Sequence, residues 1–187
     1  MNTGLDIKLI GDENQPRHCG SCTACCDGWL KSEINGELVD VGKPCRHSRP
    51  GGCAIYETRP QFPCRDFFCG WIHPDSTLPD WMRPNECGAI VFLWFDWQNQ
   101  KVINAVPVGD KIPKQTLDWL MAHAREQKRP LMFVEHIRKG KKYVGARWKG
   151  FGPPAFVKQV EQIKLAREQA KLLEMYNVVS TQKMPVN

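Results

Sequence analysis

The stretch Cys19-Gly-Ser-Cys-Thr-Ala-Cys-Cys26 places four thiols within eight residues of one another. Thiolates at the spacing C-x2-C-x2-C can point at one centre from a single tight loop, and ferredoxin-type sequences hold three corners of a 4Fe–4S cluster in this way. Cys19, Cys22 and Cys25 have this spacing, so a fourth ligand would come from elsewhere in the chain. Zinc would use the same residues in a tetrahedral site of four cysteines, or of three cysteines and one histidine. The spacing alone does not choose between the two metals.

A second set of cysteines lies in a segment that predicts few regular elements. Residues 42–84 are crowded with Gly and Pro, which indicates irregular loops. Such loops need another organiser, and a metal would serve, because binding free energy at such a site is also folding free energy. Adjacent side chains diverge, so Cys26 would ligate a second metal, act as an odd ligand or be a structural thiol. The cysteines of the later segment are Cys45, Cys53, Cys64 and Cys69.

Disulfides and thiol redox chemistry are the alternatives to metal binding. The chain has nine cysteines, an odd number, which cannot pair completely. The N-terminal residues show neither a basic leader with an apolar stretch nor a cleavage site, so we expect a cytoplasmic protein, in which structural disulfides are rare. Redox chemistry at Cys25-Cys26 is the third alternative, but adjacent cysteines form a disulfide with difficulty, and one of the two thiols would need a low pKa. Metal binding is therefore favoured.

Charge divides the chain as sharply as cysteine does. Residues 1–100 hold nine Lys and Arg against 13 Asp and Glu, whereas residues 101–187 hold 17 against seven. The longest apolar run, residues 89–95, is far too short to span a bilayer, so no membrane association is expected. Nucleotide-loop, zinc-protease and hydrolase motifs do not occur. We expect the two halves to do different jobs.

The predicted fold is α+β, with a cysteine-rich metal-binding region followed by an antiparallel sheet and two helices in the order β-β-α-β-β-α. Asn35-Gly36 predicts a tight hairpin over residues 30–41. Strands are expected over 88–97, 101–108, 131–138 and 141–148, and amphipathic helices over 112–127 and 154–176. The boundaries we expect are 1–87 for the cysteine-cluster region, 88–180 for an α+β region packed on it, and 181–187 for a flexible tail.

The cysteine pattern, together with the motif PCRHSRPGGCAIYETRPQFPCRDFFC over residues 44–69, resembles the CxxCxxCC cysteine-cluster family (YkgJ type) of zinc- or iron-chelating proteins. The resemblance covers about the first third of the chain. It implies that the eight cysteines from Cys19 to Cys69 are metal ligands, and it leaves Cys87 outside, as a buried thiol. One departure is that many relatives place a helix after the paired cysteines, where this chain offers a hairpin. The matched positions are Cys19, Cys22, Cys25, Cys26, Cys45, Cys53, Ile55, Tyr56, Arg59, Pro60, Cys64, Arg65, Phe67 and Cys69.

The expected cofactor is an iron–sulfur cluster or zinc. A flagellin lysine N-methylase carries a related cysteine pattern and is an iron–sulfur, S-adenosylmethionine-dependent enzyme, which favours iron slightly and keeps a methylase-like, protein-modifying enzyme as an alternative function. Arg59 and Arg65 flank the cysteines and could offset thiolate charge or donate hydrogen bonds to sulfur. Tyr56 could shield the site from water or pack in the core. His18, His47 and His73 are weaker ligand candidates than the cysteines.

A second functional candidate is the predicted hairpin HIRKGKKYVGARWKG. It mixes cations with Tyr143 and Trp148, a combination suited to nucleic acid or to an acidic protein partner. Lysines at a hairpin tip can also simply protect a sheet edge, and no nucleic-acid motif accompanies them. The cations are Arg138, Lys139, Lys141, Lys142, Arg147 and Lys149.

Overall fold

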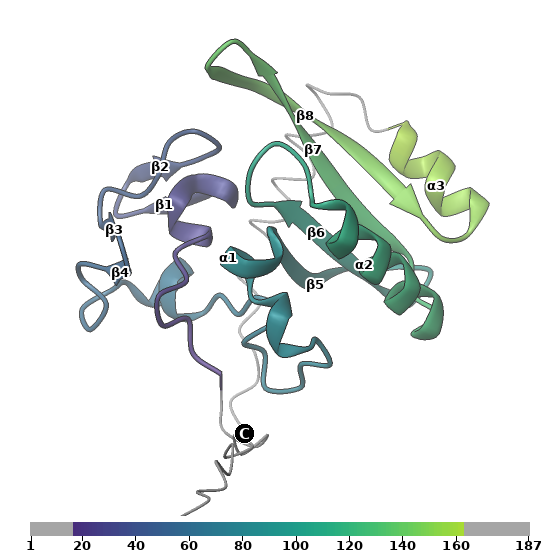
Figure 1. Cartoon of the computed structure of the whole chain (residues 1–187), viewed down its shortest axis with the longest axis horizontal. Coiled ribbons are helices and arrows are strands. Elements are labelled where there is room, and N and C mark those ends of the chain that lie inside the picture. The colour runs from purple at the N-terminus through teal and green to yellow at the C-terminus, as the bar shows by residue number, and fades with distance from the viewer. Residues whose placement is uncertain (1–16, 163–187) are drawn as a thin grey trace, which may run out of the picture.

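A computed structural model describes residues 17–162 of the 187-residue chain. The protein is a mixed α and β structure in which a four-stranded sheet stands beside a cysteine-rich region of short elements (Figure 1). In the cysteine-rich region the elements are η1 (Cys25–Trp29), β1 (Ser32–Ile34), β2 (Glu37–Val39), β3 (Ser48–Arg49), β4 (Gly52–Cys53), η2 (Gln61–Arg65), η3 (Asp80–Met82) and α1 (Pro84–Cys87). The later elements are β5 (Ala89–Trp97), β6 (Gln100–Pro107), α2 (Lys114–Glu126), β7 (Leu131–Lys139), β8 (Lys142–Phe151) and α3 (Pro154–Glu161).

The sheet has the strand order β5-β6-β7-β8 and is mixed rather than antiparallel. β5 pairs antiparallel with β6 and β7 pairs antiparallel with β8, but β6 and β7 run parallel. The expected order β-β-α-β-β-α is therefore confirmed, whereas the expectation of a wholly antiparallel sheet is wrong. The physical reason is the helix α2 between β6 and β7, because a helical crossover carries the chain back to the end of the sheet at which β6 began, so that β7 runs in the same direction.

Each face of the sheet is covered by different elements. On one face, α2 packs through Leu120 and Ala124 onto side chains of β5, β6 and β7. On the other face, α3 covers one end of the sheet through Phe156 and Val160. The cysteine region covers the other end of that second face, where it packs on Ile90, Phe92 and Val106. The sheet thus provides an apolar surface on which the cysteine region packs.

Local sequence accounts for the hairpins and the helix. Asn35 (φ 51°) and Gly36 (φ 79°) both adopt the left-handed conformation that the β1–β2 turn requires, as the Asn-Gly pair predicts. The helix α2 begins after Pro113, and its expected apolar stripe faces the core. The helix α3 is described from Pro154 to Glu161, and the rest of the helix predicted to residue 176 lies outside the described residues, as does the predicted tail.

Within residues 17–162, no helix has the length and apolar character needed to cross a membrane.

Candidate metal centre

The first group of thiols lies against the sheet. Cys22, Cys25 and the buried Cys69 pack in one cluster with Ile90 and Phe92 of β5. Cys19 belongs with them, because its thiol lies near enough to Cys25 and Cys69 to raise, together with burial, the pKa of each, and the Cys22 N–H donates a hydrogen bond of 2.9 Å to the Cys19 carbonyl. We call these four the sheet-side cysteines: Cys19, Cys22, Cys25 and Cys69.

The second group lies against the β1–β2 hairpin. Cys26, the buried Cys45 and Cys64 pack with Ile34 and Val39 in a separate cluster. Cys53 is tied to Cys45 through Ser48, whose N–H donates to the Cys45 carbonyl (3.0 Å) and which is the strand partner of Cys53. We call these four the hairpin-side cysteines: Cys26, Cys45, Cys53 and Cys64.

The neighbours Cys25 and Cys26 are the point at which the two groups divide. Both lie in the helical turn η1, where successive side chains leave the backbone in different directions. Cys25 packs toward the sheet, and Cys26 packs toward the hairpin. The Cys45 N–H donates to the Cys26 carbonyl at 2.7 Å, which holds the second group against η1. The structure thus places Cys69 with the C-x2-C-x2-C cysteines and Cys26 with the later ones.

Burial and neighbouring thiols together raise the pKa of Cys25 and of Cys26. Burial, then the sheet-side Cys69, then the hairpin-side Cys26, and after them Cys22 and Cys19, raise the pKa of Cys25 well above its ordinary value. Burial, and then the nearby thiols of the hairpin-side group, raise the pKa of Cys26 to about 12. Because each thiolate repels its neighbours, either group gains from a cation at its centre.

Backbone N–H groups already point at sulfur in both groups. The His47 N–H donates to Cys45 Sγ at 3.4 Å. Burial raises the pKa of Cys69, while N–H groups of Ile72 and Trp71 lower it by hydrogen bonding. Such donors stabilise thiolates and are typical of the surroundings of iron–sulfur and zinc thiolate sites.

The thiols are not arranged as a ready metal site. All nine cysteines lie within the described residues and all are free thiols. Among residues 17–162, no three Cys, His, Asp or Glu side chains stand in a geometry that could hold a metal ion. Binding of a metal would therefore require side-chain rotation within each group, and the fit of these residues rests on the chemistry of the donor set, since soft thiolates select zinc and iron–sulfur clusters.

Arg59 adjoins both groups. Its guanidinium lowers the pKa of Cys19 and of Cys64, in each case against the larger effect of burial, which raises it. It lies 3.7 Å from the centre of the Tyr56 ring, which is exposed rather than a cover over the sulfurs. Arg65 donates to the Arg59 carbonyl (3.1 Å) and to the Glu57 carbonyl, so it braces the loop that carries Arg59.

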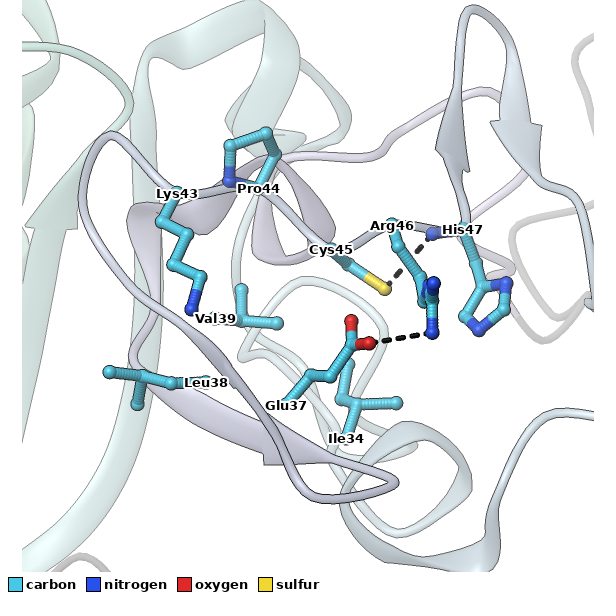
Figure 2. Close-up of a pocket in the computed structure, with 9 residues that line it drawn as sticks. All are labelled: Ile34, Glu37, Leu38, Val39, Lys43, Pro44, Cys45, Arg46 and His47. Atoms are coloured by element: carbon cyan, nitrogen blue, oxygen red, sulfur yellow. Dashed lines mark hydrogen bonds and ion pairs between the residues drawn. The ribbon is translucent and has the colours of Figure 1, made fainter.

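A pocket of about 230 Å³ opens beside Cys45 (Figure 2). Arg46 and Glu37 form an ion pair of 2.6 Å at this pocket, and His47 lies along its wall. Figure 2 shows the Cys45 sulfur pointing toward the pocket between these side chains. Of the hairpin-side cysteines, Cys45 is the one that lines this pocket.

The remaining thiol, Cys87, packs in the core cluster that includes Leu120 rather than with either group, although Cys22 and Cys69 lie near enough to add to the rise that burial causes in its pKa. Cys87 is 3% exposed and its Sγ–H donates to the carbonyls of Met82 and Ala89, both at 3.3 Å, and burial raises its pKa to about 11. This confirms the prediction of a buried thiol. His18 is exposed, and the His73 ring accepts a hydrogen bond from the Asp75 N–H.

The sequence analysis missed an aromatic contact that joins the cysteine region to the β7–β8 hairpin. The Trp29 ring stacks on His136 with 5.8 Å between centroids, and Tyr143 meets the edges of both rings. His136 Nδ1 lies 2.7 Å from the Gly109 carbonyl oxygen, and the Tyr143 hydroxyl donates to Asp110 (3.0 Å). No local pattern predicts this contact, because Trp29 lies more than a hundred residues before both His136 and Tyr143 in the sequence.

The predicted cationic surface is only partly free. Arg138 pairs with Asp110 (3.3 Å) and Lys149 pairs with Glu135 (3.0 Å). The other four cations are exposed, and no acidic side chain within residues 17–162 forms an ion pair with them. They are Lys139, Lys141, Lys142 and Arg147.

Comparison with family models, with curated proteins and with solved structures finds no match to this chain. The resemblance to the CxxCxxCC family therefore stays a prediction that rests on the cysteine pattern.

Proposed function

We propose that the protein binds metal, as zinc or an iron–sulfur cluster, through the cysteines of its N-terminal region. One observation carries the proposal: residues scattered from Cys19 to Cys69 bring eight thiols into two neighbouring groups, while the ninth, Cys87, is buried elsewhere. Thiols gathered at this density in one region are the donor set that zinc and iron–sulfur clusters require.

The surroundings of the thiols support a metal rather than disulfides. Burial raises the pKa of several of these thiols, so that thiolates would need a positive charge among them to persist at neutral pH. Backbone N–H groups at Cys45 and Cys69, and the Arg59 guanidinium beside both groups, favour the thiolate form. A bound metal would add folding free energy to a region with little apolar core of its own.

Zinc and iron remain the two candidate metals. Four thiolates bind zinc in a closed tetrahedral site, which would stabilise the region and leave no open coordination position. Four thiolates also hold a 4Fe–4S cluster, whose potential depends on hydrogen bonds to sulfur and on solvent exposure.

The experiment is to purify the protein without oxygen and measure its iron, zinc and acid-labile sulfide content together with its visible spectrum. Stoichiometric iron and sulfide with broad visible absorption would support an iron–sulfur protein, and colourless protein with zinc a zinc protein. A Cys22→Ser variant is expected to lose metal, and Cys87→Ala is the matched control that should keep it. Protein that binds neither metal, even after reconstitution, would contradict the proposal.

A second candidate function is binding of a nucleic acid or an acidic protein by the β7–β8 tip. The observation that favours it is the exposed set Lys139, Lys141 and Lys142 at the end of the hairpin, for which residues 17–162 supply no ion-pair partner. Binding of this kind weakens steeply with salt. We expect Lys139→Ala, Lys141→Ala and Lys142→Ala together to abolish salt-dependent binding to single-stranded oligonucleotides, whereas Lys114→Ala on α2 leaves it unchanged. Wild-type protein that binds no oligonucleotide at low salt would dismiss the nucleic-acid alternative.

The methylase-like alternative gains no specific support. The pocket beside Cys45, at about 230 Å³, is smaller than the ~300–1,000 Å³ that sites for drug-sized molecules occupy. A cosubstrate of the size of S-adenosylmethionine would need a larger cavity than this one.

A further inference from the structure

We infer that the eight cysteines form two separate four-thiolate centres rather than one, the first from Cys19, Cys22, Cys25 and Cys69 and the second from Cys26, Cys45, Cys53 and Cys64. The inference rests on the proposed function, and it adds the number of centres and the ligands of each. Each centre takes one thiophilic unit that prefers four sulfurs, either a zinc ion or a 4Fe–4S cluster.

The packing of the side chains carries the division. Cys22, Cys25 and Cys69 share a cluster with β5 residues, and none of them belongs to the cluster of the other group. Cys26, Cys45 and Cys64 share a cluster with Ile34 and Val39 of the β1–β2 hairpin. Two thiols that pack in different clusters, one against the sheet and the other against the hairpin, are poorly placed to reach one ion.

The backbone explains why neighbours in sequence serve different centres. The turn η1 holds Cys25 and Cys26, and its geometry directs consecutive side chains apart. Gly28 (φ 88°) interrupts the helical conformation inside this turn, and the Asp40 carbonyl lies against it, so the chain can fold back into the hairpin that carries the second group. The Cys45 N–H then bonds to the Cys26 carbonyl, which brings the loop of Cys45 alongside η1.

Each centre draws ligands from distant segments, and the count comes to four in each. The sheet-side group joins the 19–25 loop to Cys69, whose carbonyl accepts hydrogen bonds from Ile72 (3.1 Å) and His73 (3.0 Å). The hairpin-side group joins Cys26 of η1, Cys45 just before β3, Cys53 of β4 and Cys64 of η2. Four sulfurs per centre match a closed zinc site and equally a 4Fe–4S cluster.

The two centres differ in environment. The sheet-side cysteines pack on the buried side chains Ile90 and Phe92, which are at most 1% exposed. The hairpin-side cysteines adjoin the pocket lined by Cys45, Arg46 and His47 (Figure 2). We therefore expect the hairpin-side centre to exchange its metal with a chelator before the sheet-side centre does.

The first test needs no variant. Metal-free full-length protein is given one equivalent of zinc, the unprotected thiols are alkylated, and the modified positions are located by tandem mass spectrometry. Protection is expected to appear in the two sets of four stated above, each set as a unit. Protection that mixes Cys69 with Cys45 and Cys53, or that joins Cys25 to Cys26, would overturn the assignment.

The second test counts metals by native mass spectrometry in paired variants. Wild type and Cys87→Ala should bind two zinc ions. Cys22→Ser with Cys69→Ser removes two ligands of one centre and should leave one ion, whereas Cys22→Ser with Cys53→Ser should leave none. Wild type that binds a single ion, or a Cys22–Cys69 pair that binds none while its sheet amides stay protected, would refute two centres.

A parallel reconstitution with iron and sulfide distinguishes the two kinds of unit. Two clusters would give about eight irons per chain, and the Cys22–Cys69 double variant about four. Wild-type protein that takes up neither zinc nor iron would contradict the proposed function itself. Uptake of a single zinc ion or a single cluster per chain would contradict only the inference of two centres.

Discussion

The two halves of this protein solve the problem of stability differently. The sheet region, residues 89–151, buries large aliphatic and aromatic side chains on both faces of one sheet. The cysteine region buries few, chiefly Ile34, Val39, Leu78 and Met82, and its strands are only two or three residues long. Short strands and loops do not bury enough apolar surface to fold alone, so this half needs either its contact with the sheet or a bound metal.

In the cysteine region, buried cysteines occupy core positions that aliphatic residues occupy in the sheet region. Cys45 is 8% exposed and Cys69 5%, and each is a member of the local core cluster. A buried thiol packs as a small apolar group when protonated and can bind metal when ionised. In this region the same side chains therefore serve as core and as candidate ligands.

The largest expected effect comes from metal removal, which should separate the two halves. Chelation of metal-loaded protein is expected to speed hydrogen exchange at amides of residues 19–69 by at least about a hundredfold, because structural metal binding contributes ~10–16 kcal/mol in small zinc domains. Amides of β5–β8 should keep most of their protection. Equal acceleration in both halves would show that the comparison is wrong.

A core truncation in α2 tests the sheet region by itself. Leu120 is fully buried against side chains of the sheet, so Leu120→Ala should lower the free energy of unfolding by about 2–5 kcal/mol. Urea denaturation measures the loss, and Leu117→Ala, at a partly buried position, should cost less. Metal content per folded molecule is expected to stay that of the wild type. Loss of metal at the same urea concentration as unfolding of the sheet would show that the two halves unfold as one cooperative unit.

Gly28→Ala tests the turn that separates the two cysteine groups. A Cβ at Gly28 would lie 2.3 Å from the Asp40 carbonyl oxygen, and the residue has φ of 88°. We expect the free energy of unfolding to fall by about 3 kcal/mol and metal to bind more weakly to the hairpin-side cysteines, because neither the Gly28 nor the Asp40 backbone can move easily to relieve the contact. Gly36→Ala is the matched control: its φ is 79°, but nothing lies within 4 Å of the added Cβ, so the cost should be only about 1–2 kcal/mol. Thermal unfolding measures the stability of both variants. Similar losses of stability in the two would exclude the close contact with Asp40 as the cause.

The smallest expected effect is a pH dependence at the aromatic contact between the halves. Burial lowers the pKa of His136, against the Gly109 carbonyl and the Asp110 and Asp40 carboxylates, which raise it; Arg138 pairs with the same Asp110. The folded state thus prefers the neutral ring, so this contribution is present above the unfolded pKa of about 6.5 and is lost as pH falls through the lower folded pKa.

Lowering the pH from 7 to 5 should therefore reduce the free energy of unfolding through this residue, and the reduction should be absent in a variant without the imidazole. The measurement is urea denaturation at each pH, with His136→Gln as the variant that lacks the contribution. The control is His123→Gln, which removes a second histidine whose pKa burial lowers and leaves His136 in place. A His136→Gln variant with the same pH dependence as the wild type would contradict the assignment.

Much of the fold could be predicted from local patterns. The Asn35-Gly36 turn, the helix α2 and the order of strands all follow from residue conformational preference and apolar periodicity, which act over a few residues. The parallel pairing of β6 and β7 was missed, because strand direction depends on where the crossover helix packs. The contact of Trp29 with His136 was missed for the same kind of reason.

For the site, the candidate donor set could be read from the sequence alone: the eight thiols and their spacing, and the resemblance that they suggest, are all visible in the printed residues. Only the tertiary structure decided which thiols lie together, with Cys69 on the sheet side and Cys26 on the hairpin side. The physical reason is that ligand identity is a local property of the chain, whereas partnership between Cys19 and Cys69, or between Cys26 and Cys64, depends on how loops fold back over the sheet.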